Sequence, residues 1–79
     1  MDIKELITTD NEILGGQTVF KGTRVPVESL FDHLEAGISL DAFLEDFPTV
    51  TKDQAIAILE LANKLLTTKN LDQLYAAVA

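Results

Sequence analysis

The stretch from Gly15 to Val27 constrains the fold of this chain more than any other part of the sequence. It holds three of the four glycines and one of the two prolines. Two short runs rich in β-branched and aromatic residues, 18–20 and 23–25, flank Lys21-Gly22, and this pattern predicts a tight hairpin in which the glycine adopts a positive φ. Because the residue before Pro26 is restricted to an extended conformation, we expect a strand up to Pro26 and a helix just after it.

Two short helices are predicted after this stretch. Gly37 is placed to end the first helix, over about residues 28–36, in the left-handed conformation. Ser39 is a candidate N-cap for the second helix, over 40–47, which a proline follows. The connection through residues 37–39 is the short kind that joins the helices of a helix-turn-helix. Each helix carries one apolar stripe, made of Val27, Leu30, Phe31 and Leu34 in the first and of Leu40, Phe43, Leu44 and Phe47 in the second.

A longer third helix is predicted to run from the capping box of Thr51 and Gln54 to about Leu66. Its apolar residues cover more than one face, so they need a second covering surface, which could be another copy, the hairpin or a different protein. Asn70 is a candidate cap for a last helix that is too short to be stable alone in water. We expect that helix to dock on its own domain, on a sister subunit or on a partner, through Leu71, Leu74, Tyr75 and Val78.

The length of 79 residues predicts one small domain, residues 1–79, with a hairpin segment (1–26), a helical core (27–66) and a C-terminal helix (70–79). A core of this size is marginal, so dimerisation would stabilise it. The chain has no cysteine and one histidine, which argues against a disulfide framework and a transition-metal site, and we expect no cofactor. With no signal peptide and no apolar run long enough to span a bilayer, the expected location is the cytoplasm.

The net charge of −7 is unevenly distributed. Residues 27–48 carry six carboxylates and no lysine or arginine, whereas residues 49–79 balance three lysines against three carboxylates. Carboxylates spread over the outside of two helices are more typical of a solvated face than of a metal site, which needs several oxygens at one point. An acidic face also suits a basic surface on a partner.

No set of residues predicts an enzyme. Ser29 and His33 share a helical face, but the adjacent Asp32 points about 100° away and is not placed to orient His33, as nucleophilic catalysis requires. A partly exposed histidine is therefore the preferred interpretation. Gly15-Gly16 is not followed directly by a helix, and the lysine-serine pair of a phosphate-binding loop is missing, so we interpret the glycines as turn residues.

Two strings in the sequence carry a family resemblance. The string G-G-x-x-V-F-x-G-T-R-V-P-V at residues 15–27 and the string A-G-x-S-x-x-x-F-L-x-D-F-P at 36–48 closely resemble the domain-of-unknown-function family numbered four-three-three. The resemblance runs from about Ile7 to about Leu66. It implies a compact helix-turn-helix domain of the kind commonly classed as an antitoxin and often encoded beside a PIN-like ribonuclease toxin.

The resemblance also bears on the N-terminal residues. Ile3, Leu6 and Ile7 fit either one helical face or a strand that begins near Ile7. The family favours a strand over residues 7–9 and a turn through residues 10–12.

Together these observations predict a mainly α fold, with an N-terminal β-hairpin, a (winged) helix-turn-helix core of three helices and a short C-terminal helix. The expected function is that of an antitoxin that binds a PIN-like ribonuclease toxin, assembles as a homodimer and represses its own operon. The alternative is a stand-alone homodimeric interaction module without DNA binding. Because the first two helices lack basic residues, we expect DNA contacts from Lys21, Arg24, Lys52 and Gln54. The expected toxin-binding residues are Leu71, Leu74, Tyr75 and Val78.

Overall fold

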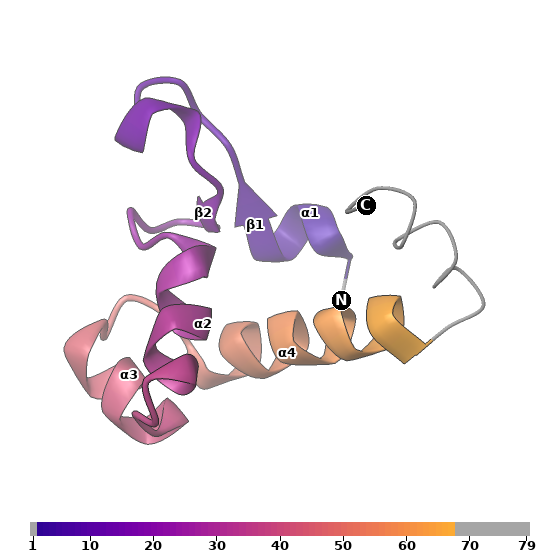
Figure 1. Ribbon diagram of the computed structural model, residues 1–79. Coiled ribbons are helices and arrows are strands. Elements are labelled where there is room, and N and C mark those ends of the chain that lie inside the picture. The colour runs from indigo at the N-terminus through magenta and orange to yellow at the C-terminus, as the bar shows by residue number, and fades with distance from the viewer. Residues whose placement is uncertain (1, 68–79) are drawn as a thin grey trace.

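The computed structural model describes residues 2–67 and is mainly helical, with a two-stranded antiparallel hairpin followed by helices (Figure 1). This architecture confirms the predicted fold class. The elements are α1 (Ile3–Leu6), β1 (Ile7–Thr8), a 3₁₀ turn (Leu14–Gly16), β2 (Val19–Phe20), α2 (Val27–Glu35), α3 (Leu40–Asp46) and α4 (Lys52–Thr67). Helices α2 and α3 pack against each other near the start of α4, and α1 lies against the second half of α4.

The strand pairing differs from the predicted one. β1 pairs with β2, with Ile7 opposite Phe20, whereas residues 23–25 form no strand and the chain makes only an isolated bridge between Val19 and Pro26. The predicted turn is present, with Gly22 at φ +79°. Two hydrogen bonds still join β2 to the chain beyond the turn, from the Phe20 N–H to the Val25 carbonyl and from the Val27 N–H to the Thr18 carbonyl. The pairing goes no further because the Phe20 carbonyl accepts from Thr23 and the Val25 N–H donates to the Thr23 hydroxyl.

The N-terminal residues combine the two alternatives that the sequence left open. Residues 3–6 form the single turn of helix α1, which Asp2 caps by accepting a hydrogen bond from the Lys4 backbone N–H at 3.5 Å. The strand that the family favours follows at once but ends at Thr8 instead of Thr9. Leu6, at the end of α1, is buried, so this short helix contributes to the core.

The core collects side chains from α1, β2, α2, α3 and the first half of α4. Phe20 from β2, Leu30 from α2 and Phe43 from α3 are completely buried, and the rings of Phe20 and Phe43 lie 6.3 Å apart. The other stripe residues of α2 and α3 are partly buried against this core. The remaining buried side chains are Leu6, Val19, Val25, Val50, Ala55 and Ile58. The two predicted stripes therefore face the core, as their spacing indicated.

The predicted turn and cap residues are confirmed at the ends of the helices. The Gly37 N–H donates to Leu34 and the Ile38 N–H donates to His33, which is a Schellman motif with Gly37 at φ +80°. The Ser39 hydroxyl accepts from the Ala42 N–H at 3.1 Å and so caps α3. α2 begins and ends one residue earlier than predicted, and α3 ends one residue earlier, at Asp46.

The capping box at the start of α4 is reciprocal. The Gln54 backbone N–H donates to the Thr51 hydroxyl at 3.1 Å, and the Thr51 backbone N–H donates to the Gln54 side-chain oxygen at 3.0 Å. The helix then runs to Thr67, and no helix in residues 2–67 is long and apolar enough to cross a membrane. The predicted last helix, over 70–79, lies outside the described residues, as do the four predicted toxin-binding residues.

Candidate macromolecular interface

An acidic face covers the outside of α2 and α3. It consists of Glu28, Asp32, Glu35, Asp41 and Glu45, all of which are exposed. Most of the six carboxylates that residues 27–48 contain therefore face solvent, as the sequence predicted. No group of histidine, cysteine or acidic side chains in the described part of the chain could hold a metal ion. The consequence of this face is electrostatic, since it repels another acidic surface and attracts a basic one.

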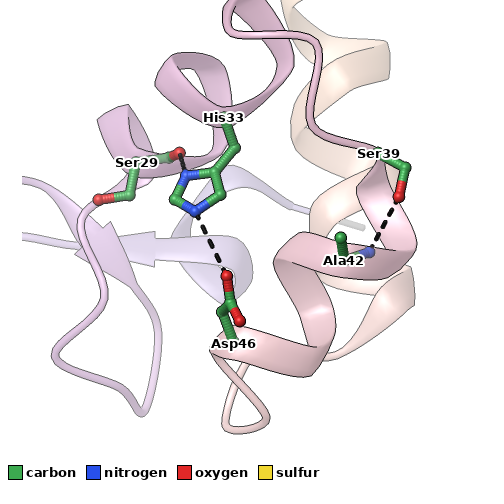
Figure 2. A network of polar contacts seen from close by, with 5 residues as sticks. All are labelled: Ser29, His33, Ser39, Ala42 and Asp46. Atoms are coloured by element: carbon green, nitrogen blue, oxygen red, sulfur yellow. Dashed lines mark hydrogen bonds and ion pairs between the residues drawn. The ribbon is translucent and has the colours of Figure 1, made fainter.

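His33 joins α2 to α3 (Figure 2). Its Nδ1 lies 2.7 Å from the backbone carbonyl oxygen of Ser29, and its Nε2 lies 3.8 Å from a carboxylate oxygen of Asp46. The ring meets the rings of Phe43 and Phe47 edge-on, at centroid distances of 5.2 and 5.5 Å. Its side chain is only 21% exposed. The histidine thus fills a place in the packing between two helices.

These contacts are not those of a nucleophilic pair. His33 contacts the carbonyl of Ser29 rather than its hydroxyl, and the carboxylate beside it belongs to Asp46 on α3 and not to the sequence neighbour Asp32. The sequence did not predict the contact with Asp46. No signal in the sequence could have found it, because it depends on how α3 crosses α2.

Two of the predicted DNA-binding residues, Lys21 of the hairpin turn and Gln54 of α4, are joined by a hydrogen bond. The Gln54 side-chain N–H₂ donates to the backbone carbonyl of Lys21 at 3.1 Å, while its oxygen accepts from Thr51. Gln54 therefore attaches the hairpin turn to the first turn of α4. The ammonium of Lys21 donates to the backbone carbonyl of Lys4 at 3.1 Å, which ties the hairpin turn to α1.

The other two predicted DNA-binding residues have different surroundings. The Lys52 ammonium lies 3.9 Å from the Asp41 carboxylate, and both side chains are well exposed, so this ion pair contributes little to stability. Arg24 is exposed on the hairpin turn and shares no hydrogen bond or ion pair with the other three in residues 2–67. It lines an open hollow together with Thr8, Ile13, Thr23, Phe47 and Thr49.

The excess apolar surface of the third predicted helix is only partly covered. α1 covers some of it, because Ile3 and Leu6 line a groove with Ala57 and Leu61 of α4. The last two leucines of α4, which we call the apolar end, remain accessible to solvent. Leu65 is 47% exposed and Leu66 is 61% exposed.

The apolar end continues the core-facing stripe of α4. Ala55 and Ile58 are buried, and Leu65 follows them at helical spacings of seven and ten residues. The same helical face thus begins in the core and ends at the surface.

Comparison with known proteins identifies the family. Residues 7–62 match the family described as "Protein of unknown function (DUF433)", and the chain belongs to that family. This confirms the resemblance found in the sequence.

A bacterial relative of this chain was also found. The chain is 37% identical over 51 residues to the uncharacterized protein y4eO of Sinorhizobium fredii (strain NBRC 101917 / NGR234). The match covers 65% of this chain but only 23% of that protein. No solved structure gives a significant match.

Proposed function

We propose that this protein is the antitoxin of a type II toxin–antitoxin pair, and that it binds and neutralises a PIN-like ribonuclease toxin. The observation that supports this proposal best is the apolar end of α4, where Leu65 and Leu66 are about half exposed. The residues expected to bind the toxin begin with Leu71, after the four polar residues 67–70. An apolar helical stripe that leaves its own core and continues toward further apolar residues suits a groove on another protein.

The acidic face of α2 and α3 supplies the second element of this proposal. A ribonuclease that binds RNA needs a basic surface, and an acidic antitoxin is attracted to such a surface before the apolar contact forms. Residues 27–48 contain no lysine or arginine, and Lys52 of α4 offsets only the Asp41 end of the face. Removing these charges is expected to slow association and to reduce its dependence on salt more than it weakens the final complex.

The test begins with the neighbouring reading frame, which should encode a PIN-like ribonuclease. Binding of that purified protein is then measured by calorimetry with the wild type and with the double variant Leu65→Ala/Leu66→Ala. We expect at least a tenfold loss of affinity, because truncated apolar anchors commonly cost more than about 1.4 kcal/mol. Leu14→Ala is the matched control, since Leu14 is 53% exposed but lies on the 3₁₀ turn. Equal affinity of all three proteins, or a wild type that does not bind, contradicts the proposal.

Operator binding by a homodimer is a second candidate function, and the position of Lys21 favours it. The hydrogen bond from Gln54 brings the turn that carries Lys21 to the first turn of α4, where Lys52 is exposed. Two copies on one site would double this small basic footprint, and phosphate contacts supply most non-specific affinity. Because Gln54 already uses both ends of its amide, we assign its role to positioning this region.

A gel-shift experiment with the gene's own promoter tests this second candidate. Lys52→Glu should weaken retardation of the fragment, and the weakening should shrink as salt rises, because fewer counterions are released. Lys64→Glu, at the other end of α4, is the control with the same charge change. If the wild type does not retard the fragment at low salt, or if both variants behave alike, the repressor function is excluded. If the protein forms a homodimer that binds neither the promoter nor the toxin, the remaining hypothesis is the stand-alone interaction module.

A further inference from the structure

The single arginine of this chain differs in its surroundings from the other charged groups. Arg24 is exposed, and no carboxylate lies within ion-pair distance of it in the described residues, where Lys52 is the one lysine or arginine that pairs with a carboxylate, that of Asp41. Because the chain has thirteen acidic residues and six basic ones, a carboxylate would be expected beside the Arg24 guanidinium. The reason lies in where the hairpin turn places it.

Arg24 borders an open hollow that contains no acidic side chain. The walls come from four separate parts of the chain: the end of β1, the residue before the 3₁₀ turn, the hairpin turn, and the connection between α3 and α4. Thr8 and Thr49 contribute hydroxyl groups, and Ile13 and Phe47 contribute apolar surface. The hollow therefore combines one cation, two threonine hydroxyl groups and apolar walls, with no carboxylate among its lining residues.

The backbone on both sides of Arg24 is held by hydrogen bonds. The Thr23 hydroxyl donates to the Phe20 carbonyl at 2.8 Å and accepts from the Val25 N–H at 3.0 Å. The Phe20 N–H donates to the Val25 carbonyl, also at 3.0 Å, and Val25 is buried. Because the turn is already ordered, a ligand needs to immobilise only the arginine side chain.

We propose that this hollow binds a carboxylate carried by a segment of a protein partner, with the Arg24 guanidinium as the forked donor. Guanidinium and carboxylate match in planar geometry and form two parallel charge-assisted hydrogen bonds. Ile13 and Phe47 then receive the apolar side chain next to the carboxylate. The inference goes beyond the antitoxin function, since it concerns a ligand class and holds for any protein partner.

The composition of the hollow favours a protein carboxylate over a nucleic acid backbone. A nucleic acid presents a series of phosphates, and its binding sites supply several lysine or arginine residues along the strand. This hollow has one cation, and the other lining residues are hydroxyl-bearing, apolar or glycine. One charge beside apolar walls fits one carboxylate beside an apolar side chain.

The test is a titration of the full chain, labelled with nitrogen-15, followed by NMR. The probe is the peptide acetyl-Leu-Asp-Leu-amide, and the control peptide carries asparagine in place of aspartate. We expect saturable shifts of the Thr23, Arg24 and Thr49 amides with the aspartate peptide and at least tenfold weaker binding of the asparagine peptide. Shifts that do not saturate by about 10 mM, or equal binding of both peptides, overturn the proposal.

Two variants locate the effect. Arg24→Gln should abolish the saturable shifts, while Lys21→Gln, which removes a cation from the same turn, should leave the affinity unchanged. Both side chains are exposed, so the unperturbed spectrum away from the turn verifies that each variant is folded. If Lys21→Gln weakens binding as much as Arg24→Gln does, the peptide responds to the general charge of the turn and the assignment to the hollow fails.

Two further titrations distinguish the source of the anion. Sodium acetate should bind more weakly than the aspartate peptide, because it lacks the neighbouring leucines, and sodium phosphate should produce no saturable shifts at these amides. Acetate as tight as the peptide would assign the hollow to a small free carboxylate. Phosphate as tight as the peptide would assign it to anions in general, and either result overturns the proposal of a protein segment.

Discussion

The two halves of α4 have the same apolar pattern and opposite surroundings. In the first half Ala55 is fully buried and Ile58 is 5% exposed, because α2, α3 and the hairpin converge there. In the second half Leu65 and Leu66 continue the pattern but are 47% and 61% exposed. The difference shows that one helical stripe in a small domain serves both as core and as a surface open to another molecule.

The different exposure of the two halves bears on the length of α4, which has sixteen residues in a small protein. Helix α4 extends past the elements that pack on its first half, and among residues 2–67 only α1 accompanies it further (Figure 1). A core needs just the first two or three turns of the helix. The remaining turns present leucines at the surface, which a monomeric domain does not require for its own stability.

The largest expected effect is in the buried half of α4. Ile58→Ala removes three carbon atoms from a side chain that is packed in the core, and such truncations cost about 2–5 kcal/mol of unfolding free energy. The measurement is urea unfolding followed by circular dichroism. Ile58→Val, with an expected cost of about 0.5–1.5 kcal/mol, keeps the effect measurable if the alanine variant is unfolded from the start. A loss below about 0.5 kcal/mol for Ile58→Ala would contradict the burial of this residue.

An intermediate effect is expected at the first residue before α4. Thr51→Ala removes the hydroxyl that accepts from Gln54, and the loss of such a cap costs about 1 kcal/mol. The control is Thr67→Ala at the other end of the helix, where the hydroxyl only donates to the Asn63 carbonyl and is exposed. We expect this change to stay within about 0.5 kcal/mol in the same unfolding experiment. Equal losses for the two threonines would show that the capping box does not stabilise the start of α4.

The smallest effect is expected in the exposed half of α4. Leu66→Ala should change the unfolding free energy by less than about 0.5 kcal/mol, because the side chain is 61% exposed and buries little area on folding. The same change should weaken binding to a partner if the apolar end is an interface. A loss of stability above about 2 kcal/mol, comparable to that of a core leucine, would show that this leucine is enclosed in the folded protein and would remove the basis for the comparison.

Sequence reasoning succeeded where the determining contacts are local. The Schellman motif at Gly37, the cap at Ser39 and the capping box at Thr51 each involve residues within a few positions of one another, and all three are confirmed. The stripes of α2 and α3 also face the core as predicted, since helical periodicity decides which residues share a face. Family membership was equally evident from two short strings.

Sequence reasoning failed where distant residues had to be brought together. The strand partner of β2 is β1, eleven or more residues earlier, instead of the nearby residues 23–25. The pairing of His33 with Asp46 rather than Asp32 depends on the packing of two helices. The hollow beside Arg24 takes its walls from four parts of the chain, so no spacing in the sequence could reveal it.

By itself, the sequence determined the order of the helices α2, α3 and α4, their ends within one or two residues and the acidic exterior of α2 and α3. These properties follow from backbone sterics, capping and residue charge, all of which act over one or two helical turns. Only the tertiary structure decided which strand pairs with β2, which apolar residues of α4 are buried and what surrounds Arg24. Those features depend on contacts between segments far apart in the chain, and local periodicity carries no information about which of two similar faces another element will cover.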